Sequence, residues 1–240
     1  MMRLVVLTGA GISVESGLST FRGPDGLWDG HPIADIATAE GFKANPALVQ
    51  RFYNRLRRQL DQVAPNPAHE ALARLEKTLG TQMHLVTQNI DDLHRRAGSV
   101  AVTAMHGDLR KVRHVNTGEV RAWSGDVPES ETMWRPHVVW FGERTIGLHS
   151  VIEKLSTADM FVAIGTSGTV YPANQFAAVA RSAGAVTAQI NLDPGDDSFD
   201  YTWTGPAATV VPVFVDRMLQ QFAAWSDSAH CSFYSKNPTR

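Results

Sequence analysis

An apolar run near the start of the chain breaks abruptly into glycine. Leu4-Val5-Val6-Leu7 is followed, after one threonine, by Gly9-Ala10-Gly11-Ile12-Ser13. The branched apolar residues predict a buried parallel strand, and the small residues after them predict a turn into a helix. Glycines in such a turn let backbone N–H groups approach a pyrophosphate, whose negative charge the helix N-terminus favours. Val14 stands where the dinucleotide fingerprint has its third glycine, so this motif alone is weak evidence.

Three later apolar runs end in polar clusters of the same kind. Residues 84–87 lead into Gln88-Asn89-Ile90-Asp91, residues 160–164 into Gly165-Thr166-Ser167, and residues 186–190 into Asn191-Leu192. In an open α/β sheet, ligands bind beyond the carboxyl ends of the strands. One such loop would be an ordinary connection. Four strands ending this way predict one shared site.

Strand and helix signals alternate through most of the 240 residues, which predicts a Rossmann-like α/β fold. We expect a doubly wound parallel sheet with helices on both faces and a smaller inserted module. Helices are predicted at 46–60, with Asn45 as N-cap, and at 68–79, ending at Gly80. Strands at 111–115 and 119–123 flank a turn at Asn116-Thr117-Gly118 and predict a hairpin. The predicted larger domain comprises residues 1–30, 80–108 and 136–222, and the small domain comprises 31–79 and 109–135. A tail is predicted at 223–240.

Composition narrows the class of protein. The formal net charge is −2, so no overall basic surplus favours nucleic acid or an anionic membrane surface. No apolar stretch approaches the roughly 20 residues that a membrane span needs. Cys231 is the single cysteine, which leaves no intrachain disulfide and no multi-cysteine zinc cluster. We expect a cytoplasmic enzyme.

Three side chains suggest chemistry at the predicted site. Asn89 and Asp91 lie two residues apart at a strand end, where an amide and a carboxylate can hold ribose hydroxyls or order a water molecule. His106 follows the apolar residues 100–104. An imidazole at a strand end can serve as a general base, because its pKa lies near ambient pH. Most of the nine histidines are expected to be structural or solvent-exposed, and His106 is distinguished by its neighbours.

The ordered motifs resemble those of the sirtuins, a family of NAD-dependent protein lysine deacylases. The resemblance extends over about residues 3–220, is highly specific, and is closest to a bacterial type related to mitochondrial desuccinylating members. The motifs that carry it are Gly9-Ala10-Gly11-Ile12-Ser13-x-x-Ser16-Gly17, Phe21-Arg22-Gly23, Thr87-Gln88-Asn89-Ile90-Asp91, His106-Gly107, Val139-Trp140-Phe141-Gly142-Glu143, Gly165-Thr166-Ser167 and Ile190-Asn191.

The resemblance implies a role for each motif. NAD⁺ phosphates and adenosine would contact Gly9, Ala10, Gly11, Ile12, Ser13, Gly165, Thr166, Ser167, Asn191 and Leu192. Phe21 and Arg22 would lie on the loop that closes over the nicotinamide end, and the nicotinamide and ribose pocket would be lined by Gln88, Asn89 and Asp91. His106 would be the general base on the ribose. The substrate peptide would add a strand along Val138, Val139, Trp140, Phe141 and Gly142. The products would be nicotinamide, O-acyl-ADP-ribose and free lysine.

The expected zinc site of the family is missing from the pattern. Most sirtuins hold zinc through four cysteines in the small module, but residues 109–135 contain none and His114 stands at the first cysteine position. Asp126, Glu129 and Glu131 lack the spacing of a tetrahedral site. We therefore expect no zinc, and a module held by apolar packing of Val115, Trp123 and Trp134.

The acyl-binding motif is also altered. Desuccinylating relatives carry Tyr-x-x-Arg, whereas this chain has Tyr53-Asn54-Arg55-Leu56-Arg57. Since residues i and i+4 share a helix face, Arg57 could replace the missing arginine beside Tyr53. On this basis we expect removal of succinyl or malonyl groups, with acetyl removal as the alternative.

Three other functions fit parts of the pattern. A hydride-transferring Rossmann enzyme would need the third glycine that Val14 replaces. An NAD glycohydrolase or ADP-ribosyltransferase would keep the fold but has no use for the peptide-pairing residues 139–142. A non-catalytic NAD sensor would have no need of His106 together with Asn89 and Asp91.

Overall fold

A parallel β-sheet forms the larger part of the molecule. The computed structural model describes residues 2–19, 27–28, 30–193 and 198–227. In these residues, six parallel strands form the sheet. In spatial order they are β11 (Tyr201–Thr204), β10 (Val186–Asn191), β9 (Met160–Ile164), β1 (Leu4–Thr8), β4 (Met83–Thr87) and β5 (Val102–Ala104). The chain winds outward from β1 in both directions, which creates a switch point between β1 and β9.

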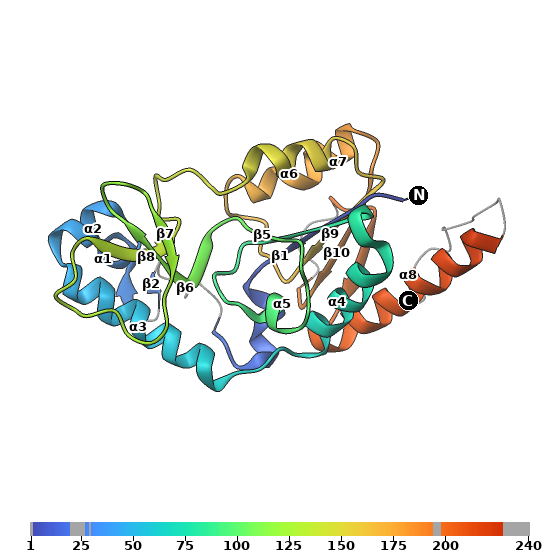
Figure 1. The fold of residues 1–240 in the computed structure, drawn as a ribbon. Coiled ribbons are helices and arrows are strands. Elements are labelled where there is room, and N and C mark those ends of the chain that lie inside the picture. Colours follow the sequence, from blue (N-terminus) through green and yellow to red (C-terminus); the bar gives the residue numbers. More distant parts are fainter. Residues whose placement is uncertain (1, 20–26, 29, 194–197, 228–240) are drawn as a thin grey trace.

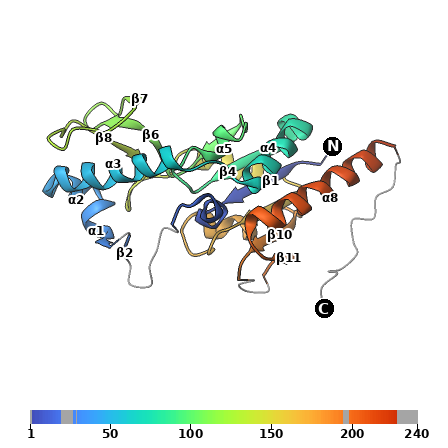
Figure 2. The ribbon, with the colours of Figure 1, turned by 90° about the horizontal axis from the view of Figure 1, so that it is seen from below.

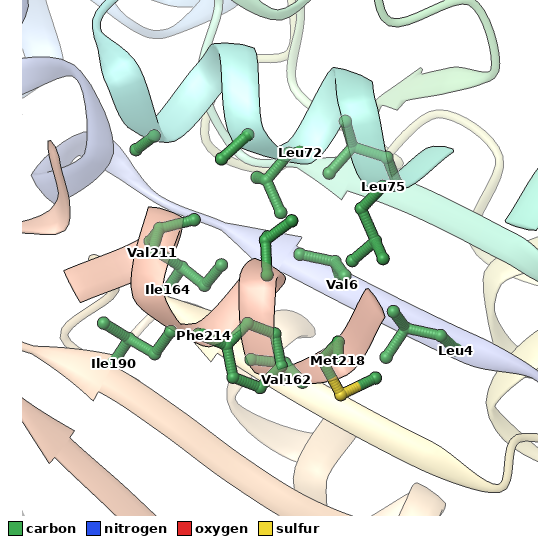
Figure 3. Packing of buried hydrophobic residues seen from close by; sticks show 14 of the residues in the cluster. Leu4, Val6, Leu72, Leu75, Val162, Ile164, Ile190, Val211, Phe214 and Met218 are labelled. Atoms are coloured by element: carbon green, nitrogen blue, oxygen red, sulfur yellow. The ribbon is translucent and has the colours of Figure 1, made fainter. Parts of the chain in front are cut away.

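Helices cover both faces of this sheet, because side chains along each buried strand alternate between the two faces. Leu4 and Val6 pack against α4 (Pro67–Leu79) and α8 (Ala207–Asp227), as Figure 3 shows. Val5 and Leu7 pack against α6 (Leu148–Leu155) and α7 (Phe176–Ser182) on the opposite face. Figure 1 shows the two helix layers on either side of the strands. The predicted doubly wound α/β fold is confirmed.

The inserted module combines a small antiparallel sheet with three helices. Its sheet has the order β7 (Val120–Ala122), β6 (Gly107–His114), β8 (Trp134–Val138). The helices are α1 (Ile33–Ile36), α2 (Ala39–Ala44) and α3 (Pro46–Gln62), preceded by the short strands β2 (Leu27–Trp28) and β3 (His31–Pro32). Asn45 caps α3 as predicted, its side-chain oxygen accepting a hydrogen bond from Leu48 N at 3.0 Å. In Figure 2, α3 runs from this module toward the larger sheet.

Packing places three segments differently from the predicted domain division. The predicted division places helix α4 in the small module, but the apolar face of α4 is buried on the parallel sheet beside α8. The break at Pro65 is therefore the physical boundary. Residues 136–138 belong to β8 of the small sheet rather than to the larger domain. Helix α8 continues to Asp227, past the predicted end at residue 222, and the rest of the predicted tail, 228–240, lies outside the described residues.

Polar side chains of α3 hold the loop between β7 and β8. The Asn54 amide group donates to Val127 O at 2.7 Å, and its oxygen accepts from Val127 N at 2.8 Å. One turn earlier, Gln50 Nε2 donates to Trp134 O at 2.7 Å and to Glu131 O at 3.1 Å. Both side chains are buried, so these bonds are shielded from water. We call Gln50 and Asn54, with the loop groups they bind, the α3 clamp.

The prediction that Val115, Trp123 and Trp134 hold this module by apolar packing is wrong in its details. Val115 is 40% exposed and is not part of a core. The Arg121 guanidinium lies 3.7 Å from the ring centre of Trp134 and 5.2 Å from that of Trp123. The two indoles therefore hold a cation rather than an aliphatic side chain.

In the described part of the chain, no helix has the length and apolar character needed to cross a bilayer.

Candidate active site

A single cleft of about 1980 Å³ brings most of the predicted site residues together. It lies at the carboxyl ends of β1, β4, β9 and β10 and extends into the small module. The predicted residues that line it are Gly9, Ala10, Gly11, Ser13, Tyr53, Gln88, Asn89, Asp91, His106, Val138, Val139, Trp140, Phe141, Gly142, Gly165, Thr166, Ser167, Asn191 and Leu192. Phe21 and Arg22 lie outside the described residues.

Three glycines form the floor of the cleft between β1 and β9. A Cβ atom on Gly9 would lie 2.7 Å from Gly165 O, and one on Gly11 would lie 2.7 Å from Gly165 Cα. Gly165 has a φ of +60°, and a Cβ atom there would lie 2.5 Å from Ile12 N. The contact is closed by a hydrogen bond from Gly11 N to Gly165 O at 2.8 Å. Only glycine allows the backbones to approach this closely.

The helix predicted after Gly9 is a 3₁₀-helix, η1, covering Ala10–Ser16. It ends at Gly17, which adopts the left-handed conformation with a φ of 98°. The Ile12 side chain is fully buried in the core and does not line the cleft. Ile12 instead anchors η1 through its carbonyl oxygen, which accepts from Asn66 Nδ2 at 2.8 Å.

Asn89 and Asp91 converge on Ser13. Asn89 Nδ2 donates to Gly9 O at 3.1 Å and to Ser13 Oγ at 3.2 Å. Ser13 Oγ donates in turn to Asp91 Oδ2 at 3.0 Å, and Leu93 N donates to Asp91 Oδ1 at 3.0 Å. Burial raises the pKa of Asp91, while the bonds from Leu93 and Ser13 oppose that rise. The loops after β1 and β4 are thereby fixed relative to each other.

His106 is held in one tautomer. Its Nδ1 lies 2.9 Å from the carbonyl oxygen of Gln88, which can only accept, so Nδ1 carries the proton. In the neutral ring, Nε2 therefore keeps its lone pair. Burial lowers the pKa of His106 from its ordinary value, and the Gln88 carbonyl only partly offsets this effect. The imidazole is neutral at pH 7 and is able to accept a proton.

Thr166 connects the ends of three strands. Gln88 Nε2, after β4, donates to Thr166 Oγ1 at 2.9 Å. Asn191 Nδ2, at the end of β10, donates to Thr166 O at 2.8 Å. Ser167 Oγ lies 2.9 Å from Thr169 Oγ1, and Leu192 is exposed. The rim of the cleft over β9 and β10 is therefore polar and fixed by side-chain hydrogen bonds.

At the small-module end, the cleft is apolar and Arg57 does not reach it. Tyr53 is fully buried, and its hydroxyl accepts from Trp140 Nε1 at 2.9 Å. Burial raises the pKa of Tyr53, so the phenol stays protonated. Leu56 lines the cleft, whereas Arg57 is 2% exposed and donates from Nε to Leu109 O at 2.8 Å.

The prediction that Arg57 contacts the substrate is therefore wrong. Arg57 also donates from Nη1 to Asn54 Oδ1 at 2.9 Å. Arg57 does follow Tyr53 by one helical turn, as the spacing implied. Its long side chain turns instead to the buried carbonyl of Leu109, which needs a donor.

Residues 139–142 follow β8 and are not themselves a strand. Val139 N donates to His106 O at 2.8 Å, and Phe141 N donates to Ala37 O at 3.0 Å. Trp140 N donates to Glu143 Oε2 at 2.9 Å. These three N–H groups are already used, so a peptide that pairs here must donate to the carbonyl oxygens.

Several cleft residues were missed by the sequence reasoning. Arg144 directly extends the 139–143 motif, and Val170 and Tyr171 follow the Gly165-Thr166-Ser167 cluster. Because these residues directly follow predicted motifs in the sequence, their position could have indicated that they line the cleft. Tyr171 is 76% exposed despite its large aromatic ring.

The glycine floor yields a direct prediction. In Gly11→Ala, the new methyl group meets backbone atoms of Gly165, which cannot move aside as a flexible side chain would. We expect overpacking of about 1–3 kcal/mol and NAD⁺ binding weakened by about tenfold or more, measured by thermal unfolding and isothermal titration. Gly118→Asn is the control, because the site is open and asparagine tolerates its φ of 72°. Unchanged NAD⁺ affinity in Gly11→Ala would contradict this role.

Comparison with known proteins places the chain among related sequences and structures. The model of the Sir2 family matches residues 9–172. A Salmonella typhimurium protein named NAD-dependent protein deacylase is 52% identical over 230 residues, which cover 91% of this chain and 84% of that protein. A variant Sir2 homologue in complex with ADP-ribose superposes with a TM-score of 0.84 and 34% identity, covering 92% of this chain and 93% of the other. A Sir2 homologue in complex with NAD gives a TM-score of 0.83 and 34% identity, covering 91% and 90%.

Proposed function

This chain belongs to the Sir2 family, and on that premise we propose that it removes acyl groups from protein lysine side chains with NAD⁺ as co-substrate. NAD⁺, acyl-lysine and one water molecule give nicotinamide, O-acyl-ADP-ribose and free lysine. The observation that carries the proposal is His106, a neutral imidazole held by Gln88 in the same cleft as the three-glycine floor.

The described residues fit NAD⁺. Gly9, Gly11 and Gly165 all line the cleft, and their close packing joins the loops after β1 and β9 where a pyrophosphate would lie. Ala10 and Ser13 lie beside it, and the polar rim formed by Thr166, Ser167 and Asn191, with Leu192, faces the adenosine half. Gln88, Asn89 and Asp91 hold the ribose and nicotinamide half. We assign Phe21 and Arg22, outside the described residues, to the same end.

The chemistry divides between positioning and proton transfer. Bound NAD⁺ supplies the ribose hydroxyl that accepts the acyl group once the nicotinamide bond has broken. His106 Nε2 accepts the proton of that hydroxyl, while Nδ1 remains bonded to Gln88 O. Asn89 and Asp91 keep their places through Ser13, so the polar groups around the reacting carbon need no rearrangement.

The substrate peptide lies along residues 138–142 in this proposal. With the N–H groups of Val139, Trp140 and Phe141 already used, the peptide donates its own N–H groups to carbonyl oxygens of this segment. Main-chain recognition of this kind accepts varied sequences. A protein substrate also agrees with the net charge of −2, which offers no general attraction to nucleic acid.

We further assign the protein to the cytoplasm. The requirement for NAD⁺ supports this location. The single cysteine, Cys231, agrees with a reducing compartment.

Replacing the base tests the proposal. His106→Ala should lower turnover of an acyl-lysine peptide by about 10²–10⁴ and leave thermal unfolding nearly unchanged. Because burial lowers the His106 pKa, the wild-type rate should fall only as pH drops below the ordinary histidine value of about 6.5. Mass spectrometry of peptide and nicotinamide provides the measurement.

Two outcomes would contradict this assignment. Wild-type turnover in His106→Ala would exclude His106 as the base. Nicotinamide release that needs no acyl-lysine would instead favour an NAD glycohydrolase or an ADP-ribosyltransferase.

For the acyl group, we propose a preference for uncharged groups such as acetyl over succinyl or malonyl. A carboxylate on the acyl group would need Arg57 in the cleft, but the Arg57 guanidinium is bound to Leu109 and Asn54. Leu56 occupies the cleft wall one turn from Tyr53. A carboxylate placed there would lose water without gaining a cation among the described residues of the inner wall.

This preference is measurable as kcat/KM on matched peptides. We expect acetyl-lysine to exceed succinyl-lysine by about tenfold or more, which corresponds to about 1.4 kcal/mol. Leu56→Arg should raise activity on the succinyl peptide, whereas Leu56→Met, of similar volume, should not. A wild-type preference for succinyl-lysine would overturn the proposal.

We also propose that the small module folds without zinc, with the α3 clamp in the place of a metal. His114 is engaged in its own turn, its Nδ1 accepting from Asn116 N and Thr117 N, each at 3.3 Å. Buried Asn54 binds both backbone groups of Val127.

Metal chelation should therefore leave the stability of the protein unchanged, whereas a mutation in the α3 clamp should lower it. EDTA treatment should leave the Tm unchanged. Asn54→Ala should lower stability by about 2–4 kcal/mol, because it leaves two buried backbone groups unpaired. Exposed Arg58→Ala, which breaks only the surface pair with Asp126, should cost less than about 1 kcal/mol. Stoichiometric zinc in protein purified without added metal would refute the proposal.

A further inference from the structure

Arg144 is a cation at the cleft without a partner in the described residues. Two other titratable side chains that line the cleft have partners: Asp91 accepts from Ser13 and Leu93, and His149 Nε2 lies 3.2 Å from Glu153 Oε1. Arg144 is exposed, and no ion pair or hydrogen bond joins it to another described residue. An unpaired guanidinium beside a binding cleft is available to a ligand carboxylate.

Its neighbour Glu143 is engaged with other groups, since each of its carboxylate oxygens accepts a hydrogen bond. Oε1 accepts from Arg135 at 2.6 Å, and Oε2 accepts from Trp140 N at 2.9 Å. Arg113 lies opposite Arg135 in the β6–β8 register and also faces Glu143. Burial and the like charge of Arg135 lower the Arg113 pKa. Arg113 and Arg135 both interact with the carboxylate of Glu143, and Arg144 follows Glu143 directly in the sequence, so these four residues together carry a net positive charge.

The position of Arg144 indicates which ligand would meet it. It follows the peptide-pairing residues 138–142 directly after Glu143, whereas the glycine floor and Asn191 belong to the other half of the cleft. Val170 and exposed Tyr171 line the same cleft. A side chain flanking the modified lysine would pass this rim, while the NAD⁺ phosphates would lie over the glycines.

We propose that Arg144 is a specificity-determining residue that favours acyl-lysine sites flanked by aspartate or glutamate. The proposal rests on the proposed deacylase function and adds a sequence preference to a recognition mode that otherwise reads the main chain. The pairing would contribute equally to substrate and transition state, so its effect falls on KM. At a solvent-exposed rim the effect is expected to be modest and sensitive to salt.

The experiment compares acetyl-lysine peptides that differ only in Glu against Gln at the positions next to the lysine. For the wild-type enzyme, we expect a KM about three- to tenfold lower for the Glu peptide, with the difference reduced in 0.5 M NaCl. Arg144→Gln should remove the difference, and Arg144→Glu should reverse it in favour of a lysine-flanked peptide. Arg217→Gln is the control, since Arg217 is exposed on α8 and does not line the cleft.

The possible results separate this proposal from the one it rests on. A Glu-to-Gln KM ratio that Arg144→Gln leaves unchanged would overturn the role of Arg144. A change in KM for NAD⁺ instead of peptide would place Arg144 at the co-substrate. Fluorescence anisotropy of labelled peptides measures the same preference without turnover, so absent catalysis would count only against the deacylase function.

Discussion

The close packing of Gly9 and Gly11 against Gly165 is the contact on which the rest of the site depends. It joins the ends of β1 and β9 at the switch point of the sheet and leaves no room for a Cβ atom at any of the three positions. The loop after β4 is then tied to the same floor through Asn89 and Gly9, and the loop containing His106 is tied to it through Gln88. A change of a few tenths of an ångström at the glycines would therefore reach both the cofactor side and the base.

Much of this arrangement could be predicted from the sequence, because it depends on strands that end abruptly in polar residues and on helices with a regular apolar repeat. Apolar runs identified β1, β4, β9 and β10, and the polar residues after them identified the cleft. Helical periodicity correctly predicted α3, but it could not predict the direction in which the Arg57 side chain points. Arg57 follows Tyr53 by one helical turn, as the spacing predicted, but its guanidinium donates to the buried carbonyl oxygen of Leu109 instead of entering the cleft. Likewise, the sequence predicted the helix at 68–79, but packing decides that this helix, α4, covers the parallel sheet.

Helix α3 illustrates how one element can serve three neighbours. Tyr53 and Leu56 line the cleft, Gln50 and Asn54 hold the loop after β7, and Arg57 binds β6. Asn54 also accepts a hydrogen bond from Arg57, so the loop attachment and the β6 attachment are directly connected. The shape of the small module is thus transmitted to the cleft wall through a single rigid helix. This coupling gives the clamp a functional consequence beyond stability.

The polar groups of the cleft differ in how firmly other protein groups hold them. Deep in the cleft, Asp91 and His106 are each fixed by a hydrogen bond to a neighbouring loop, from Ser13 Oγ and to Gln88 O respectively, and burial shifts both pKa values toward the uncharged form. Fixed dipoles and few free charges suit a reaction in which charge develops only transiently. At the rim, the Arg144 side chain is exposed to solvent and has no partner among the described residues. Because recognition there involves no group that holds the base or the floor, substrate preference can change without disturbing the chemistry.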